Sequence, residues 1–203
     1  RLTAAREMVE GGPIDFLTGD WLAELTMLIL WKQRRRNSEA GYAGTFLTQM
    51  EQVLGTCVDR GIKVVTNAGG LNPAGCADRV REIAQRLGLN LKVAHIEGDD
   101  LMGRIDGLRP HLNHLDTGAP FTVDPVSANA YLGAWGIVSA LDAGADVVVC
   151  PRVTDASVVV GPAAWWWNWG HTDWDPLAGA VAAGHVIECR SEEHTSELQS
   201  RGL

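Results

Sequence analysis

Residues 62–75 read IKVVTNAGGLNPAG, and this stretch decides the fold. The β-branched run at 62–66 is typical of a short buried strand, and a glycine-containing turn leads from it into a predicted helix at about 74–87. Gly88 ends that helix, and residues 91–96 return as a second strand. This order is a βαβ unit, in which the two strands run parallel.

The alternation continues on both sides of this unit. Upstream, residues 21–35 predict a helix that Asp20 caps and that is apolar nearly all round, which indicates a buried helix. An amphipathic helix follows at 42–58. Downstream, residues 127–143 predict a long helix, and the apolar run at 145–150 is typical of a third, buried parallel strand.

The intervening segments are less regular. Residues 99–108 predict a short helix, residues 110–125 a loop, and residues 177–183 a last helical stretch. Because helices and strands alternate, the fold class is α/β. Three strands cannot close a barrel, so we predict an open parallel, Rossmann-like sheet with flanking helices; a fragment of a β/α barrel is the alternative.

Composition narrows the class of protein. The 203 residues, 46% of them hydrophobic, are enough for one domain with a full core. A net charge of −8 argues against nucleic acid as the main partner. No apolar run approaches the roughly 20 residues of a membrane span. Four cysteines without CxxC spacing and no secretory signal favour a reducing, cytoplasmic location.

The last fourteen positions differ in character from the rest. Residues 190–200 read RSEEHTSELQS, with one apolar residue and no periodicity, and resemble the translation of a sequencing-library adapter. We therefore expect an α/β domain at 1–189 and a non-native polar tail at 190–203. The chain has no initiator Met, from which we expect the natural start to lie upstream.

Ligands of parallel α/β sheets bind beyond the carboxyl ends of the strands, so polar residues there are the first candidates. The turn after the first strand offers backbone N–H groups and a helix start that could hold a phosphate or carboxylate. The turn matches neither GxGxxG nor a P-loop, and a plain tight turn is an equally good interpretation. The candidate binding residues of this turn are Asn67, Gly69, Gly70 and Asn72.

The second and third strands are followed by charged groups. Asp99 and Asp100 could transfer a proton or bind a cation, although a helix cap is the plainer interpretation. After the third strand, Arg152 could clamp a carboxylate or phosphate, and Asp155 is a second candidate for proton transfer. An Arg–Asp ion pair is the structural alternative. Asp100, Thr154 and Ser157 complete the predicted substrate- and anion-binding set. No metal site and no particular cofactor are predicted.

Two further groups of side chains each have two possible roles. Five of the eight tryptophans lie within residues 165–174, where they could line an apolar pocket for a prenyl or acyl chain or form a packing or oligomer surface. His185 and Cys189 could form a nucleophile pair, but a structural cysteine is the better interpretation.

The chain resembles the N-terminal part of the acyclic terpene utilisation (AtuA) family. The likeness is carried, in the family's order, by GDWLAELTM (19–27), VTNAGGLNP (65–73), AHIEGDD (94–100), SANAYLGAW (127–135), GADVVV (144–149), RVTDAS (152–157) and GHVIEC (184–189). Trp21 stands where the family pattern has Tyr, and residues 165–167 are more aromatic than the pattern.

The resemblance implies a role in the bacterial breakdown of acyclic terpenes such as citronellol and geraniol, close to acyl-CoA enzymes. We therefore expect an enzyme that acts on a branched acyl or acyl-CoA intermediate. The alternatives are a non-catalytic partner subunit of an acyl-CoA enzyme and a nucleotide- or CoA-binding regulatory domain. A small acyl or acyl-CoA substrate is the expected partner, and a homo-oligomer or an acyl-CoA enzyme partner stays open; no nucleic acid or membrane is expected.

Overall fold

The computed structural model describes residues 2–189, so the predicted polar tail lies outside the described residues. Its core is an open, all-parallel four-stranded sheet with the order β1-β2-β4-β3. The strands are β1 (Phe16–Gly19), β2 (Lys63–Thr66), β3 (Val93–His95) and β4 (Val147–Val149). The open α/β sheet is thereby confirmed, and the alternative of a barrel fragment is wrong.

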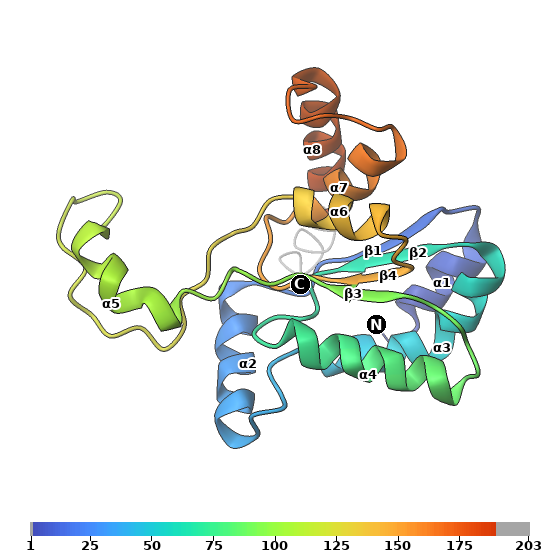
Figure 1. The fold of residues 1–203 in the computed structure, drawn as a ribbon, viewed down its shortest axis with the longest axis horizontal. Coiled ribbons are helices and arrows are strands. Elements are labelled where there is room, and N and C mark those ends of the chain that lie inside the picture. The colour runs from blue at the N-terminus through green and yellow to red at the C-terminus, as the bar shows by residue number, and fades with distance from the viewer. Residues whose placement is uncertain (1, 190–203) are drawn as a thin grey trace, which may run out of the picture.

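Helices cover both faces of the sheet (Figure 1). One layer contains α1 (Ala4–Gly11), α3 (Gly44–Arg60) and α4 (Pro73–Arg86), and the other contains α6 (Trp135–Asp142), α7 (Ser157–Trp166) and α8 (Trp174–Cys189). Val64 and Val147 pack in the core of the first layer, whereas Val65 and Val148 pack in that of the second. Both faces of the central strands are buried, which is why their sequences are continuously apolar.

The βαβ unit forms as the sequence predicts. Asn72 caps α4, because its Oδ1 accepts a hydrogen bond from the backbone N–H of Gly75 at 2.9 Å. Pro73 occupies the first turn of this helix. Gly61 ends α3 in the left-handed conformation, with φ at +68°. The boundaries of the unit are therefore set by local chemistry.

β1 and α6 differ from the prediction. β1 was not predicted, because its four residues include Thr18 and Gly19 and carry no clear apolar run. The helix predicted from residue 127 begins only at Trp135. Residues before it extend instead and bond to distant backbone: Ala130 N–H donates to the carbonyl of Asp99, and Leu132 N–H to that of Arg152. These long-range bonds replace the local helical ones.

The helix α2 (Glu24–Arg36) is not the buried helix that its apolar sequence predicts. Met27 and Leu30 are its buried residues, and the opposite side is exposed. Asp20 does not cap it either. Thr26 accepts a hydrogen bond from the N–H of Ala23 at 2.5 Å, and the helix begins there.

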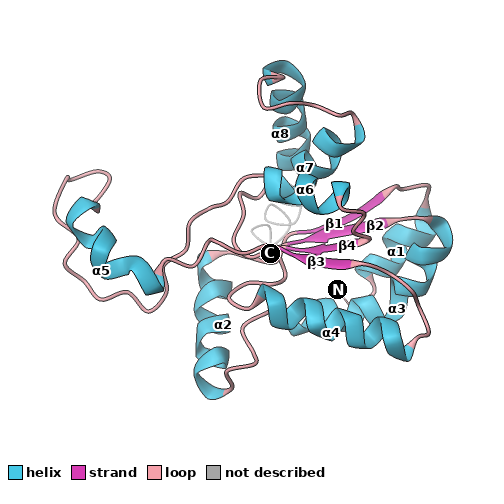
Figure 2. Ribbon diagram, in the orientation of Figure 1, coloured by secondary structure: helices cyan, strands magenta, loops and turns pink. Residues whose placement is uncertain are grey.

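An arm projects from the body between β3 and α6 (Figures 1 and 2). It contains η1 (Met102–Arg104), α5 (Ile105–Leu108) and η2 (Arg109–His111), so the helix predicted at 99–108 is shorter than expected. The predicted loop at 110–125 is confirmed except for its first turn. Among the helices of residues 2–189, none has the length and apolar character that crossing a bilayer requires.

Candidate functional site

Asn67 and Asp20 join the carboxyl ends of β1 and β2. Asn67 is fully buried, and its Oδ1 accepts a hydrogen bond from the backbone N–H of Trp21 at 2.7 Å. Its amide nitrogen donates to Oδ1 of Asp20 at 2.5 Å. Asp20 directly follows β1, so the rule that polar residues at strand ends form sites would have found it had β1 been recognised.

Asp99 joins the ends of β3 and β4. Its side chain is buried, and Oδ2 accepts hydrogen bonds from the backbone N–H of Arg152 at 3.2 Å and from the side-chain amide of Asn129 at 2.8 Å. Burial raises the pKa of the Asp99 carboxyl. The structure thus brings together Asp99 and Arg152, two candidates that the sequence separates widely.

Arg152 is held by the protein itself. Nη1 donates to the carbonyl of Leu22, and Nη2 donates to the hydroxyl of Tyr131 at 2.7 Å. The guanidinium also lies 4.3 Å from the centre of the Tyr131 ring and 3.5 Å from Oε1 of Glu24. Nη1 is 3.7 Å from Oδ1 of Asp155, which is the ion pair that the structural alternative predicts. Tyr131 and Glu24 were not among the sequence candidates.

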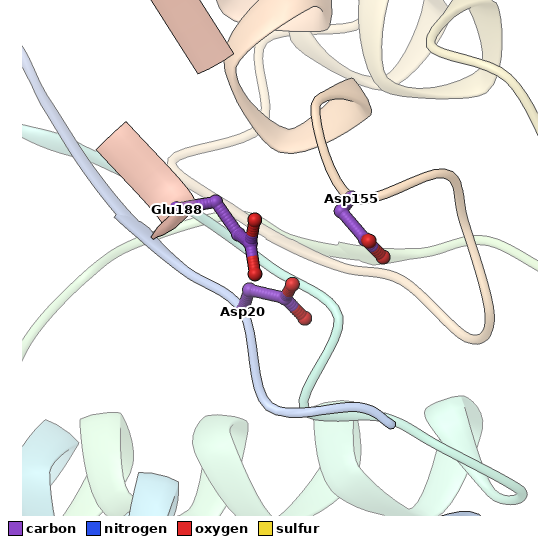
Figure 3. Close-up of side chains that lie close together, drawn as sticks. All are labelled: Asp20, Asp155 and Glu188. Atoms are coloured by element: carbon purple, nitrogen blue, oxygen red, sulfur yellow. The ribbon is translucent and has the colours of Figure 1, made fainter. Parts of the chain in front are cut away.

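Asp155 lies in a group of three carboxylates with Asp20 and Glu188 (Figure 3). Their oxygen atoms lie within 4.8 Å of one another. Burial raises the pKa of Asp155, and the neighbouring charge of Asp20 raises it further. Oδ1 of Asp155 is enclosed and accepts no hydrogen bond from the described residues. A carboxyl group that holds its proton more tightly than usual suits general acid–base chemistry.

The same three carboxylates are the described residues that could hold a metal ion, a site that the sequence did not predict. An all-oxygen ligand set suits Mg²⁺ or Ca²⁺. The guanidinium of Arg152, 3.7 Å from Asp155, would oppose a cation at that oxygen.

The glycine-containing turn makes its hydrogen bonds within the protein. The N–H of Gly69 donates to the carbonyl of Cys150, and that of Gly70 to the carbonyl of Asn67. The side-chain amide of Asn72 donates to the carbonyls of Glu39 and Ala40. An anion at this turn would have to displace these bonds. These hydrogen bonds are the ones expected of a plain tight turn. The anion-binding role of the turn stays a prediction.

The remaining polar candidates close turns. The exposed Asp100 accepts a hydrogen bond at 2.9 Å from the N–H of Met102, the first residue of η1. The hydroxyls of Thr154 and Ser157 lie 2.5 Å apart at the start of α7.

His185 is exposed on α8, and the side chain of Cys189 lies outside the described residues.

Two of the tryptophans, Trp165 and Trp166, lie at the other end of the strands. Trp165 packs edge-on against Phe16, with ring centres 6.0 Å apart, and Nζ of Lys63 lies 5.7 Å from its ring. Phe16 and Lys63 are the first residues of β1 and β2, so this cluster is at the amino edge of the sheet. Trp165 and Trp166 are therefore remote from the carboxyl ends of the strands, and the choice between a pocket lining and a packing surface stays a prediction.

A cavity of about 510 Å³ borders the carboxylates, and Asp20 and Glu188 are part of its wall. β1 and helices of both layers line it. Most of the lining is apolar and includes Met8, Leu17, Met50, Val158, Val159 and Ile187. Its volume is in the range of small-molecule sites.

The sequence profile described as acyclic terpene utilisation family protein AtuA matches residues 1–192. The chain belongs to the AtuA family. Membership of the AtuA family implies a role in acyclic terpene utilisation. No curated protein and no solved structure matches the chain.

Proposed function

We propose that this AtuA-family protein is an enzyme of acyclic terpene catabolism that acts on a branched acyl or acyl-CoA intermediate by proton transfer at Asp155. The observation that carries the proposal is the convergence of Asp20, Asp155 and Glu188 at the end of the sheet, where burial, and then the charges of the neighbouring carboxylates, raise the pKa of Asp155. Asp99 stays a second candidate, although its carboxylate already accepts two hydrogen bonds.

Electrostatic repulsion determines the orientation that we propose for such a substrate. The carboxylates of Asp20, Asp155 and Glu188 would repel the phosphates of CoA. We therefore place the uncharged thioester end at Asp155 and the hydrocarbon chain in the adjoining apolar cavity. In this conformation Arg152 makes internal contacts, which support a role in holding the site together rather than as the first contact of an anion.

The test begins with a thermal-shift screen of branched acyl-CoAs, the free acids and the corresponding alcohols. A ligand that raises the Tm is then assayed for turnover with wild type and Asp155→Asn. We expect turnover to fall by about 100-fold or more with binding nearly unchanged. Asp59→Asn, an exposed acid on α3, is the matched control. Full turnover in Asp155→Asn would refute the proposed role.

A specific observation favours a second candidate, the partner subunit of an acyl-CoA enzyme. Trp166, Trp167 and Trp174 are exposed. Aromatic residues of this kind are enriched where proteins bind one another. A complex that co-purifies from cells, survives Asp155→Asn and is lost in Trp167→Ser would support this candidate. A CoA-binding regulatory domain has less support, since the N–H groups of the glycine-containing turn are engaged internally.

A further inference from the structure

One face of α2 is apolar and uncovered. Leu25 is 69% exposed and Ile29 is 45% exposed, and both belong to one face with Lys32 and Arg36, because these residues follow at steps of three and four. The face is therefore apolar in its first half and basic in its second. An apolar helix face left in water at this position indicates a surface that another molecule covers.

The arm, defined as residues 101–126, carries the complementary features. Arg109 organises it by bonding to the carbonyl of Val123 and pairing with Asp124 at 2.8 Å. Its tip presents Leu115, which is 97% exposed, followed directly by the exposed acid Asp116. An apolar residue next to an acid matches the apolar and basic halves of the α2 face.

The segment that follows the arm also contacts the first turn of α2. The hydroxyl of Tyr131, shortly after the arm, donates to Oε1 of Glu24, the first residue of α2, at 2.8 Å. The base of the arm and the first turn of α2 therefore lie near each other, and the two elements project from the body in different directions (Figure 1). In a two-fold dimer, a contact of one copy's arm with the other copy's α2 is repeated by symmetry, so that both pairs of surfaces are covered at once.

We propose that two copies of this chain form a symmetric dimer in which the arm of each copy packs on α2 of the other. Leu115 covers Leu25 and Ile29, and Asp116 faces Lys32 and Arg36. A second copy is favoured over an unrelated partner because the chain itself supplies both the apolar and the charged complement. The dimer does not depend on the chemistry proposed for Asp155.

The test is sedimentation velocity of the 203-residue protein over a range of concentrations, which separates a dimer from larger aggregates. We expect a reversible dimer. Ile29→Asp should raise its dissociation constant roughly tenfold or more, because it buries a charge in the apolar contact. Leu87→Asp, at the exposed end of α4, is the matched control and should leave the dissociation constant unchanged.

Charge reversal distinguishes this contact from any other dimer. Asp116→Lys and Lys32→Glu should each weaken the dimer, and the double variant should recover most of the loss. A second measurement does not depend on stability: Leu115→Cys combined with Ile29→Cys, in a Cys189→Ser background, should give a covalent dimer on oxidation. A wild-type protein that stays monomeric, or a dimer that is indifferent to all of these changes, would overturn the proposal.

Discussion

The backbone N–H of Arg152 donates a hydrogen bond to Oδ2 of Asp99 across 3.2 Å, although the two residues are 53 positions apart. This bond joins the segment after β3 to the end of β4. The same carboxylate oxygen accepts from Asn129, so one buried oxygen organises three segments at the end of the sheet.

Asp99→Ala should therefore destabilise the fold by about 2–4 kcal/mol, because it leaves the N–H of Arg152 and the amide of Asn129 without an acceptor. Urea denaturation measures the change. Asp100→Ala is the control. It loses only the bond from the N–H of Met102, near the surface, and should cost about 1 kcal/mol or less. Equal losses in the two variants would contradict the structural role of Asp99.

The difference in stability between Asp155→Asn and wild type should depend on pH in a defined direction. The pKa of Asp155 is raised in the folded protein, so the folded state holds this proton more tightly than the unfolded chain. The stability linked to it is present below the unfolded pKa near 3.8 and is lost as pH rises through the folded pKa. Because asparagine carries no charge, Asp155→Asn removes this loss of stability with rising pH.

The variant should consequently be more stable than wild type at pH 7 and lose this advantage in acid. The difference should stay below about 1 kcal/mol, since the side chain is 48% exposed and solvent screens its charge interactions. Thermal melts from pH 4 to pH 7 measure it. An advantage that grows as the pH falls would show that the sign of the pKa shift is wrong.

Gly70→Ala tests the close packing of the glycine-containing turn. Gly70 has φ at +53°, and an added Cβ would lie 2.4 Å from Cδ1 of Leu30 and 2.8 Å from the carbonyl oxygen of Gly41. Gly61→Ala is the matched control, because Gly61 has a similar φ of +68° with nothing within 4 Å. We expect about 1 kcal/mol for Gly61→Ala and roughly 1–3 kcal/mol more for Gly70→Ala. Equal losses would mean that only φ matters.

The edge of β1 should limit solubility. The N–H of Asn67 donates to the carbonyl of Gly19, and groups along a strand alternate in direction, so the N–H of Thr18 faces away from β2. No described strand pairs with that side. We expect residues 1–189 alone to be poorly soluble, since a free edge promotes association.

Thr18→Pro should raise the solubility with little loss of Tm, because proline is tolerated where the N–H makes no ladder bond. Leu17→Pro, whose N–H faces β2, should instead unfold the protein or cost about 3 kcal/mol. Light scattering and thermal melts compare the two. A sharp cooperative melt of soluble residues 1–189 without any substitution would refute the prediction.

The sequence by itself determined the elements whose causes are local. The strand at residues 63–66, the cap at Asn72 and the stop at Gly61 depend on neighbours within a few positions, so periodicity and capping chemistry predict them. The parallel sheet follows from the order of these elements. At the strand ends Asp99 bonds to Arg152 and Asn67 bonds to Asp20, whereas the binding and catalytic roles of these residues stay predictions.

Only the tertiary structure decided what depends on pairing between distant segments. Asp20, Asp155 and Glu188 meet because β1 lies at one edge and α8 returns to it, which no local pattern records. Residues 127–134 leave the helix because their backbone bonds to Asp99 and Arg152 replace the helical ones. The exposed face of α2 also depends on distant segments. Helix periodicity predicts that a helix has an apolar face, but only the packing of the whole chain determines whether that face is covered.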